Sequence, residues 1–346
     1  MQKNKRKQRV RRVLLVISVA VLFVVGWYGI GRATSASRSI RLVDRGADPG
    51  VVSTQRVDAN RSIRVVAYNI AHGRGGSDSN WSDADSRSQR LLDIAALLRE
   101  MDADVVVLNE VDFCTVWSGH ENQAEIIAAA AGYRYRVEQI NIDISVPLAS
   151  YRFGNAILSR LPIHNPKVID LPGYAVWETV LGGKKQAILC EIALNKGLSV
   201  QVVGAHFDTR GDESIRVASA NAVADVVGDL DSAVVIAGDL NSTPAVLPGA
   251  RLDEDLSTAV DVLVEDWGFS RAVQGDALDQ AKGTFPSWEP ARAIDWILVN
   301  RVVRLDRIEV RESGLSDHLP VAADIKLYST ATDIEPALPI LGQRAE

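Results

Sequence analysis

Side chains that can bind a metal ion or move a proton recur at the ends of the apolar segments of this 346-residue chain. A strand often ends in a polar residue that enters a turn, so one such residue would carry little meaning. Here six segments share the feature, and their polar residues come from four types only: Asn, Asp, Glu and His. They are Asn69, Glu110, His206 with Asp208, Asp239 with Asn241, Asp295, and Asp317 with His318. The repetition predicts that these side chains converge on one site.

Spacing along a strand indicates how some of these side chains point. Residues two apart share a face of a strand, so Asp239 and Asn241 are expected to point the same way. Asp295 lies within the apolar run "AIDWILV", and a buried aspartate is unfavourable unless it is paired. We therefore expect His318 to be its partner. Asp317 precedes His318 directly and so faces the other way, which predicts a different role for it.

This combination of residues suits the hydrolysis of phosphate esters. Carboxylates and amides supply hard oxygen ligands, which Mg²⁺ or Mn²⁺ prefers, and a paired histidine can transfer protons. Three other kinds of site lack their motif in the sequence. There is no HExxH of a zinc peptidase, no GxxxxGK[ST] of a P-loop and no GxSxG of a serine hydrolase.

The elements that must position these residues can be read from apolar periodicity. Apolar, β-branched runs predict ten strands, near residues 63–70, 104–112, 133–140, 154–160, 185–194, 199–208, 233–241, 293–300, 304–312 and 319–327. Helical spacing predicts helices over 85–101, 121–132 and 212–230. Several strands are apolar throughout, so both of their faces must be covered. The pattern predicts one α/β domain over residues 61–328, built from two packed β-sheets flanked by helices, and a loosely attached tail over 329–346.

The N-terminal segment is typical of a membrane anchor. Residues 1–12 carry seven Lys or Arg and no acid, and the uncharged run 13–31 nearly spans a hydrocarbon core of about 30 Å. Trp27 and Tyr28 lie near its outer end, where amphipathic aromatic rings prefer to sit. The basic flank predicts a cytoplasmic N-terminus, a single transmembrane signal anchor and an extracytoplasmic catalytic domain joined by a linker over 32–60.

Other interpretations of this segment remain open at this stage. A cleaved signal peptide would release a secreted protein, and small residues at 33–37 offer a cleavage region without a clear A-x-A motif. A buried helix of the domain is a further alternative. The two cysteines, Cys114 and Cys190, leave a single disulfide open, because an extracytoplasmic location would permit one.

The charge of the chain disfavours tight binding of a nucleic-acid backbone. The total is −6, and the first twelve residues contribute seven positive charges, so the remainder carries −13. An acidic body gains little from counterion release, although a local basic groove stays possible. No feature of the sequence indicates an obligate protein partner.

Read in order, the motifs resemble the endonuclease/exonuclease/phosphatase superfamily, which includes deoxyribonucleases, neutral sphingomyelinases and inositol polyphosphate 5-phosphatases. The resemblance spans about residues 63–327. The segments that carry it are "YNIAHG" (68–73), "LNEVD" (108–112), "GNAILSR" (154–160), "GAHFDT" (204–209), "IAGDLNSTP" (236–244), "GTFPSWEPARAIDWILV" (283–299) and "LSDHLPV" (315–321). It implies a four-layer α/β sandwich, in agreement with the strand and helix pattern.

The resemblance also implies a role for each residue of the expected site. Glu110 would be the main metal ligand, with Asn69 beside it in the metal or phosphate shell and Asp317 as a further metal-shell carboxylate. Five residues would be catalytic: His206 would contact or protonate the scissile phosphate, Asp239 and Asn241 would orient the attacking water, and Asp295 would fix His318 as general base or transition-state stabiliser. Asn155 and Arg160 would bind the phosphate or, alternatively, only end a strand.

These expectations combine into a membrane-anchored, Mg²⁺- or Mn²⁺-dependent hydrolase of phosphate esters, most simply a phosphodiesterase. Its substrate would be a lipid headgroup, a nucleotide or a nucleic acid. The alternatives are a secreted or surface nuclease that acts on DNA, and a non-catalytic binding domain of the same fold. The intact set of motifs argues against the last, because a degenerate copy would have lost some of these residues.

Overall fold

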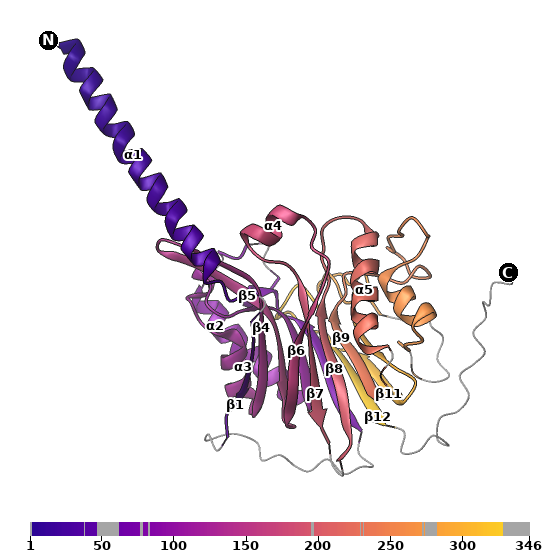
Figure 1. Cartoon of the computed structure of the whole chain (residues 1–346). Helices are drawn as coiled ribbons and strands as arrows, with labels where there is room; N and C mark the ends of the chain where they lie inside the picture. Colours follow the sequence, from indigo (N-terminus) through magenta and orange to yellow (C-terminus); the bar gives the residue numbers. More distant parts are fainter. Residues whose placement is uncertain are drawn as a thin grey trace.

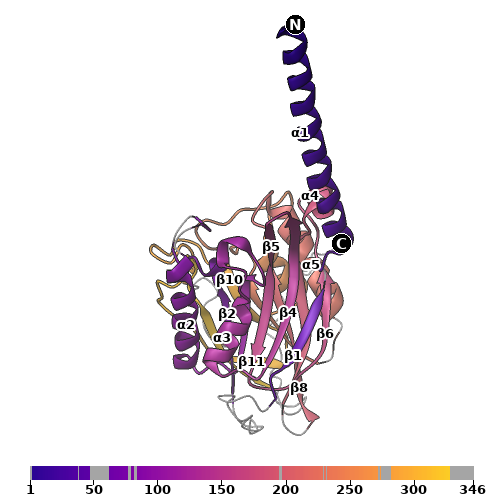
Figure 2. The ribbon, with the colours of Figure 1, turned by 90° about the vertical axis from the view of Figure 1, so that its left-hand side faces the viewer.

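Strands from the whole length of the chain form two β-sheets that face each other in the computed structural model of this protein (Figure 1). The structure describes residues 2–37, 39–46, 62–76, 79–81, 84–194, 197–228, 230, 232–271, 273 and 282–327. Helices cover the outer face of each sheet (Figures 1 and 2). The predicted four-layer α/β sandwich is confirmed.

The first sheet has seven strands in the order β1-β4-β5-β3-β2-β12-β11. Only β2 and β3 run parallel to each other, and all other neighbours are antiparallel, so the sheet is mixed. Its strands are β1 (Ile40–Asp44), β2 (Ile63–Asn69), β3 (Val105–Asp112), β4 (Tyr135–Val146), β5 (Ala149–Ser159), β11 (Val303–Val310) and β12 (Val321–Leu327).

The second sheet has five strands in the order β10-β9-β8-β7-β6, and its one parallel pair is β8 with β9. Its strands are β6 (Ile163–Asp170), β7 (Gln186–Ala193), β8 (Ser199–His206), β9 (Ala233–Asp239) and β10 (Asp295–Val299). The two parallel pairs lie opposite each other, since β2 and β3 both contact β9 across the interface. The carboxyl ends of four strands therefore meet at one end of the sandwich.

Apolar side chains fill the three spaces between the four layers. The inward faces of both sheets form the central core, which includes Val65, Val107, Val202 and Val235. The second core lies between the five-stranded sheet and the helices α5 (Glu213–Val227), α6 (Ala259–Asp261) and the following π turn η4 (Val262–Asp266). The third lies between the seven-stranded sheet and the helices α2 (Ala84–Glu100) and α3 (Gln123–Ala131). Strands apolar on both faces are thus covered on both faces, as their sequence predicts.

Four elements depart from the expectations. The strand expected at 133–140 is longer and pairs with β5 as a hairpin that ends in a turn at Leu148. Strand β6 and the short helix α4 (Val176–Leu181) are not predicted by periodicity. Strand β1 lies within 32–60, the range expected to be a linker, and extends the seven-stranded sheet by pairing with β4. Residues 47–61 and the expected tail 329–346 lie outside the described residues.

The N-terminal segment forms one helix, α1 (Gln2–Ala33), that projects from the domain (Figure 1). Residues 6–33 are long and apolar enough to cross a membrane, and none of that apolar window is buried against the domain. The buried-helix interpretation is therefore wrong, whereas the anchor and the signal peptide both remain compatible with an exposed helix. Cys114 and Cys190 are both free thiols.

Gly238, directly before the catalytic candidate Asp239, is required by the backbone. Its φ is +133°, and a Cβ atom at this position would lie 2.0 Å from the carbonyl oxygen of Ala205. We expect Gly238→Ala to lower the free energy of unfolding by about 3 kcal/mol, through strain and a backbone clash. Chemical denaturation measures this. Gly314→Ala is the control, because its Cβ would meet nothing within 4 Å, and equal stabilities of the two variants would contradict the expectation.

Candidate active site

An aspartate–histidine pair lies at the carboxyl ends of the central strands. His318 Nδ1 is 2.9 Å from Asp295 Oδ2, as the sequence predicts, and both side chains are buried. The other ring nitrogen, Nε2, faces Asp239 Oδ2 at 3.8 Å and Asp317 Oδ1 at 4.0 Å. Strand pairing explains this arrangement, because Asp295 begins β10 directly opposite Asp239 at the end of β9.

Asp239 is held by three amide groups as well as by its position in the sheet. Its Oδ2 accepts a hydrogen bond from Asn69 Nδ2 at 2.9 Å, and its Oδ1 accepts one from the backbone N–H of Asn241 at 2.9 Å. Its own backbone N–H donates to Asn109 Oδ1 at 2.9 Å. Asn241 adopts φ +50° and donates its amide to the Phe207 carbonyl at 3.2 Å. These contacts fix the carboxylate in one orientation, towards His318 and His206.

The surroundings raise the pKa of both Asp239 and His318. Burial raises the pKa of Asp239 to about 7, and the charge of Asp295 acts in the same direction, against the opposing effect of His318. Burial lowers the pKa of His318, but the charges of Asp295 and Asp239 and the hydrogen bond to Asp295 outweigh it and raise the pKa to about 10. At neutral pH, His318 is therefore an imidazolium beside a carboxylate that can accept a proton.

His206 approaches the same oxygen of Asp239 as His318 does, with Nε2 at 3.6 Å from Asp239 Oδ2. The ammonium nitrogen of Lys185 is within 2.7 Å of His206 Nε2 and 2.9 Å of Nδ1. Burial and the neighbouring Lys185 charge hold the pKa of His206 well below its usual range, so the ring is neutral. Burial also lowers the pKa of Lys185, against the charges of Glu110 and Asp239. The neutral ring of His206 and the amine of Lys185 thus face the same space.

Glu110 and Asp317 both contact the side chain of Arg74. The guanidinium of Arg74 lies between them, with Nη2 at 2.6 Å from Asp317 Oδ2 and Nη1 at 3.7 Å from Glu110 Oε2. Burial would raise the pKa of Glu110, but the neighbouring His72, Lys185 and His318 hold it well below its ordinary value, so the carboxylate is ionised. With the nearby amide of Asn69, these oxygens form a donor set that fits a hard divalent ion.

A different trio, Asp239, Asp295 and His318, also places three ligand atoms within 4.8 Å of one another. We favour Glu110 and Asp317 as the metal ligands. The hydrogen bond between Asp295 and His318 already occupies Asp295 Oδ2 and His318 Nδ1, and breaking it in a buried pocket is costly.

A second aspartate–histidine pair adjoins Glu110. His72 Nδ1 is 2.8 Å from Asp112 Oδ1, and His72 Nε2 is 3.4 Å from Glu110 Oε2. Asp112 Oδ2 also accepts a hydrogen bond from the indole N–H of Trp117 at 2.9 Å. The backbone of His72 adopts φ +53°, which turns the ring inward instead of towards solvent. The pair fixes the orientation of the Glu110 carboxylate.

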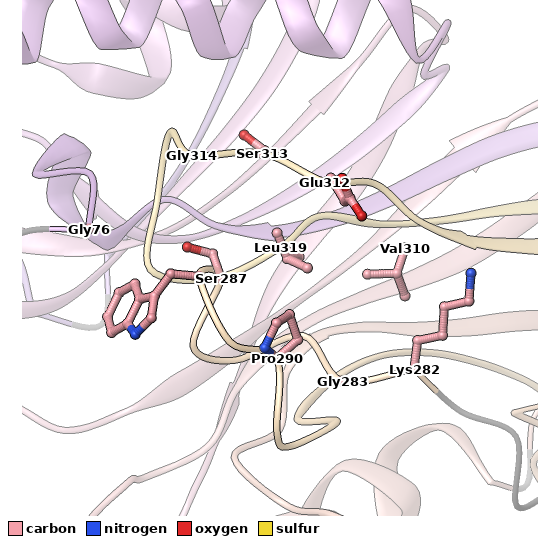
Figure 3. A pocket seen from close by; sticks show the side chains of 11 residues that line it. Gly76, Lys282, Gly283, Ser287, Pro290, Val310, Glu312, Ser313, Gly314 and Leu319 are labelled. Atoms are coloured by element: carbon pink, nitrogen blue, oxygen red, sulfur yellow. The ribbon is translucent and has the colours of Figure 1, made fainter.

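Two hollows flank these residues. A cavity of about 220 Å³ is lined by groups of the site and by neighbours that include His72, Glu110, Lys184, Lys185, His206 and Arg210. A wider hollow of about 880 Å³ lies beyond the 317–319 segment, and Figure 3 shows Ser287, Leu319 and Glu312 around it. The smaller cavity is lined by Glu110, Lys185 and His206 of the site, so it is the better candidate for the reacting phosphate.

The structure brings most of the sequence-predicted residues together: Asn69, Glu110, His206, Asp239, Asn241, Asp295, Asp317 and His318. Asn155 is fully buried and hydrogen-bonded to Asn109 Nδ2 and the Gln186 carbonyl, which leaves its amide no access to a substrate. Arg160 follows the far end of β5 and pairs with Asp102 at 2.5 Å. The expectation that Arg160 binds the phosphate is therefore wrong, because the strand carries it away from the site.

The sequence prediction did not include five residues of the site: His72, Arg74, Asn109, Asp112 and Lys185. Asn109 and Asp112 lie on β3 next to Glu110 in the quoted motif "LNEVD", which is the signal that could have found them. Lys185 follows an unpredicted helix and has no motif around it. Asp208, which follows β8, is buried and forms a two-point ion pair with Arg210 instead of facing Asp239.

Comparison with known protein families identifies the group to which this arrangement belongs. A model of the Endonuclease/Exonuclease/phosphatase family matches residues 66–318. The chain belongs to this family. The matched range begins in β2 and ends at His318, so it contains every residue of the cluster described above. The family assignment suggested by the sequence motifs is confirmed, and a search of curated proteins finds no match.

Solved structures of the family share the fold at low sequence identity. An endonuclease/exonuclease/phosphatase from Beutenbergia cavernae is 23% identical with a TM-score of 0.58, over 78% of this chain and 72% of that chain. The mannosyl-6-phosphatase Bt3783 of Bacteroides thetaiotaomicron is 18% identical with a TM-score of 0.55, over 76% and 99%. The catalytic domain of human Nocturnin with bound sulfate is 16% identical with a TM-score of 0.54, over 84% and 97%.

Proposed function

We propose that this protein is a membrane-anchored phosphodiesterase that depends on Mg²⁺ or Mn²⁺ and acts on the extracytoplasmic side. The observation that carries the proposal is the cluster at the strand ends. It combines two carboxylates that can hold a metal ion, a buried Asp239 that can accept a proton, and an imidazolium held by Asp295. The exposed helix α1, with its basic flank, supports the anchor and its orientation.

Each residue of the cluster has its own role in hydrolysis. Asp239, held by Asn69 and Asn241, orients a water molecule and takes its proton as the water oxygen bonds to phosphorus. The ester P–O bond to the alcohol breaks in the same displacement, and the departing oxygen takes a proton from solvent water. His318, kept charged and in one orientation by Asp295, stabilises the negative charge that develops on the phosphoryl oxygens. His206, which lies close to Lys185, also contacts the phosphate.

A divalent ion would be held by Glu110, Asp317 and Asn69. When bound, such an ion neutralises charge on the phosphoryl oxygens and polarises phosphorus towards attack. Arg74 now neutralises the two carboxylates. The Arg74 side chain would therefore have to move aside, or stay next to the ion, when the ion binds.

Activity with and without metal tests the proposal directly. We expect the full chain in detergent to hydrolyse bis(p-nitrophenyl) phosphate faster than p-nitrophenyl phosphate with Mg²⁺, and to lose both activities in EDTA. Plasmid nicking and release of phospholipid headgroups, assayed in parallel, separate a nuclease from a lipid phosphodiesterase. Calorimetry that detects neither metal nor phosphate-ester binding would favour the non-catalytic alternative and contradict the proposal.

A substitution of Glu110 tests the metal site itself. We expect Glu110→Gln to raise the Mg²⁺ concentration for half-maximal activity at least about tenfold, because one charged ligand is lost. The matched control is Glu100→Gln, an exposed glutamate on α2 that pairs only with Arg311 among the described residues. Unchanged metal activation in Glu110→Gln would place the ion elsewhere, with the trio of Asp239, Asp295 and His318 as the next candidate.

A further inference from the structure

A group of large apolar side chains is exposed around the outer end of α1. Helix α4 carries four of them in six residues, and the others come from the segment before it and from the tip of the β4–β5 hairpin. We call this surface the apolar rim. Its members and their exposed fractions are Leu148 (100%), Tyr174 (50%), Val176 (83%), Trp177 (63%), Val180 (64%) and Leu181 (45%). Soluble surfaces rarely gather so many large apolar side chains in one place.

The rim is joined to the last turns of α1. The hydroxyl of Tyr28 donates a hydrogen bond to the Leu181 carbonyl, and Arg32 Nε donates to the Val180 carbonyl at 3.0 Å. On the hairpin side, Arg32 Nη1 donates to the Asp143 carbonyl at 2.8 Å. Helix α1 thus ends between α4 and the β4–β5 hairpin (Figures 1 and 2). The rim therefore lies level with Trp27 and Tyr28, where a spanning helix leaves the hydrocarbon core.

The rim adjoins the catalytic cavity without lining it. Glu178 of α4 pairs with Arg210, and Arg210 lies 5.1 Å above the ring of Tyr174. Arg210 in turn holds Asp208, and both line the cavity with Lys185. Only a short segment separates α4 from Lys185, which contacts His206. Glu178 therefore links α4 to the lining of the cavity, while the apolar side chains of α4 are exposed.

We propose that the apolar rim inserts into the outer interface of the lipid bilayer that holds α1, and that it presents the catalytic cavity to phosphate esters in the headgroup layer. This inference rests on the proposed function and names the substrate class as phosphorylated lipid headgroups. A bilayer fits better than a protein partner, because the rim is continuous with the spanning helix and carries Trp and Tyr, which favour the interface. Exposed valines and leucines on a short helix gain apolar burial there.

The depth of the rim in the membrane can be measured on the full chain in nanodiscs. An environment-sensitive fluorophore is attached at Val176→Cys in a Cys114→Ser background, since Cys190 is fully buried. We expect quenching by bromine- or nitroxide-labelled lipids and protection from aqueous iodide. The matched control is Leu198→Cys, an exposed leucine near the amino end of β8, at the opposite end of the sheet, where we expect iodide quenching only. This readout does not require catalysis, so it separates the rim from the proposed function.

A charged variant tests what the rim does for the reaction. We expect Val176→Asp with Val180→Asp to lower hydrolysis of vesicle phospholipids about tenfold, because charged side chains resist insertion. Hydrolysis of soluble bis(p-nitrophenyl) phosphate is expected to stay within about twofold, and Leu198→Asp to change neither activity.

Three results would overturn the inference. The label at position 176 could be open to iodide and untouched by lipid quenchers, which would place the rim in water. It could be shielded from both quenchers, which would show that protein covers the rim. Equal losses on vesicle and soluble substrates in the charged variant would show damage to the site instead of lost insertion. Absence of any hydrolysis by the unmodified chain, with normal lipid quenching, would reject the proposed function and leave the membrane contact standing.

Discussion

Asp239→Asn is expected to lower kcat at least about 10³-fold, which corresponds to about 4 kcal/mol of lost transition-state stabilisation. The amide keeps the size of the side chain and can still contact Asn69, but it cannot take a proton from water. The buried position at the end of β9, with a pKa near 7, makes this carboxylate the strongest candidate for that transfer. Initial rates on a soluble phosphodiester at saturating Mg²⁺ measure the loss.

The design needs a control for folding and for charge. Asp93→Asn removes one negative charge from an exposed site on α2, where Asp93 only accepts a hydrogen bond from Gln89 among the described residues, and we expect full activity. Circular dichroism and the thermal midpoint establish that Asp239→Asn is folded. A folded Asp239→Asn protein with more than about a tenth of normal kcat would show that another group takes the proton.

Asp295→Asn is expected to lower kcat about 10³-fold while KM changes much less, because Asp295 acts through His318 and not on the substrate. Its Oδ2 accepts the His318 Nδ1 hydrogen bond at 2.9 Å, and its charge is a main reason that the pKa of His318 reaches about 10. Loss of the charge lowers that pKa. If the imidazolium form is the active one, activity then falls at a lower pH on the alkaline side of the profile.

Steady-state kinetics across pH 6 to about 10 test this assignment against the ordinary His range. Asp324→Asn serves as the control, since Asp324 lies on β12 at the far end from the site and pairs with Arg64. We expect its profile to match that of the unmodified chain. Asp295 would be structural only if Asp295→Asn kept the alkaline limb of the pH–kcat profile and lost kcat only because less of the protein was folded.

The residues that converge on the site were largely predictable because strand ends carry them. A run of apolar residues fixes where each strand stops, and parallel neighbours stop at the same edge. The positions of Asn69, Glu110, His206 and Asp239 follow from this rule. The pair of Asp295 with His318 was predictable for a separate reason, since a buried carboxylate within an apolar strand needs a partner.

Elements that depend on pairing across the chain were not predictable. Strand β6 exposes much of its length, and α4 packs with its apolar residues outward, so neither shows the periodicity of a buried face. Strand β1 exists because β4 offers it an edge, and its five residues give no signal alone. Local patterns indicate which residues need burial. They carry no information about which distant segment of the chain will pack or pair with them.

The active site likewise has a part that local patterns predicted and a part that they did not. The sequence alone determined the family, the layered fold, the exposed apolar N-terminal segment and eight side chains of the cluster, because each depends on local spacing and residue type. Only the tertiary structure decided that Lys185 reaches His206, that Asp112 orients His72 beside Glu110, and that Arg160 lies at the wrong end of β5. It also decided that α1 ends beside the apolar rim. Each of these depends on the distance between segments far apart in the chain, which is set by how the two sheets pack and not by any local preference.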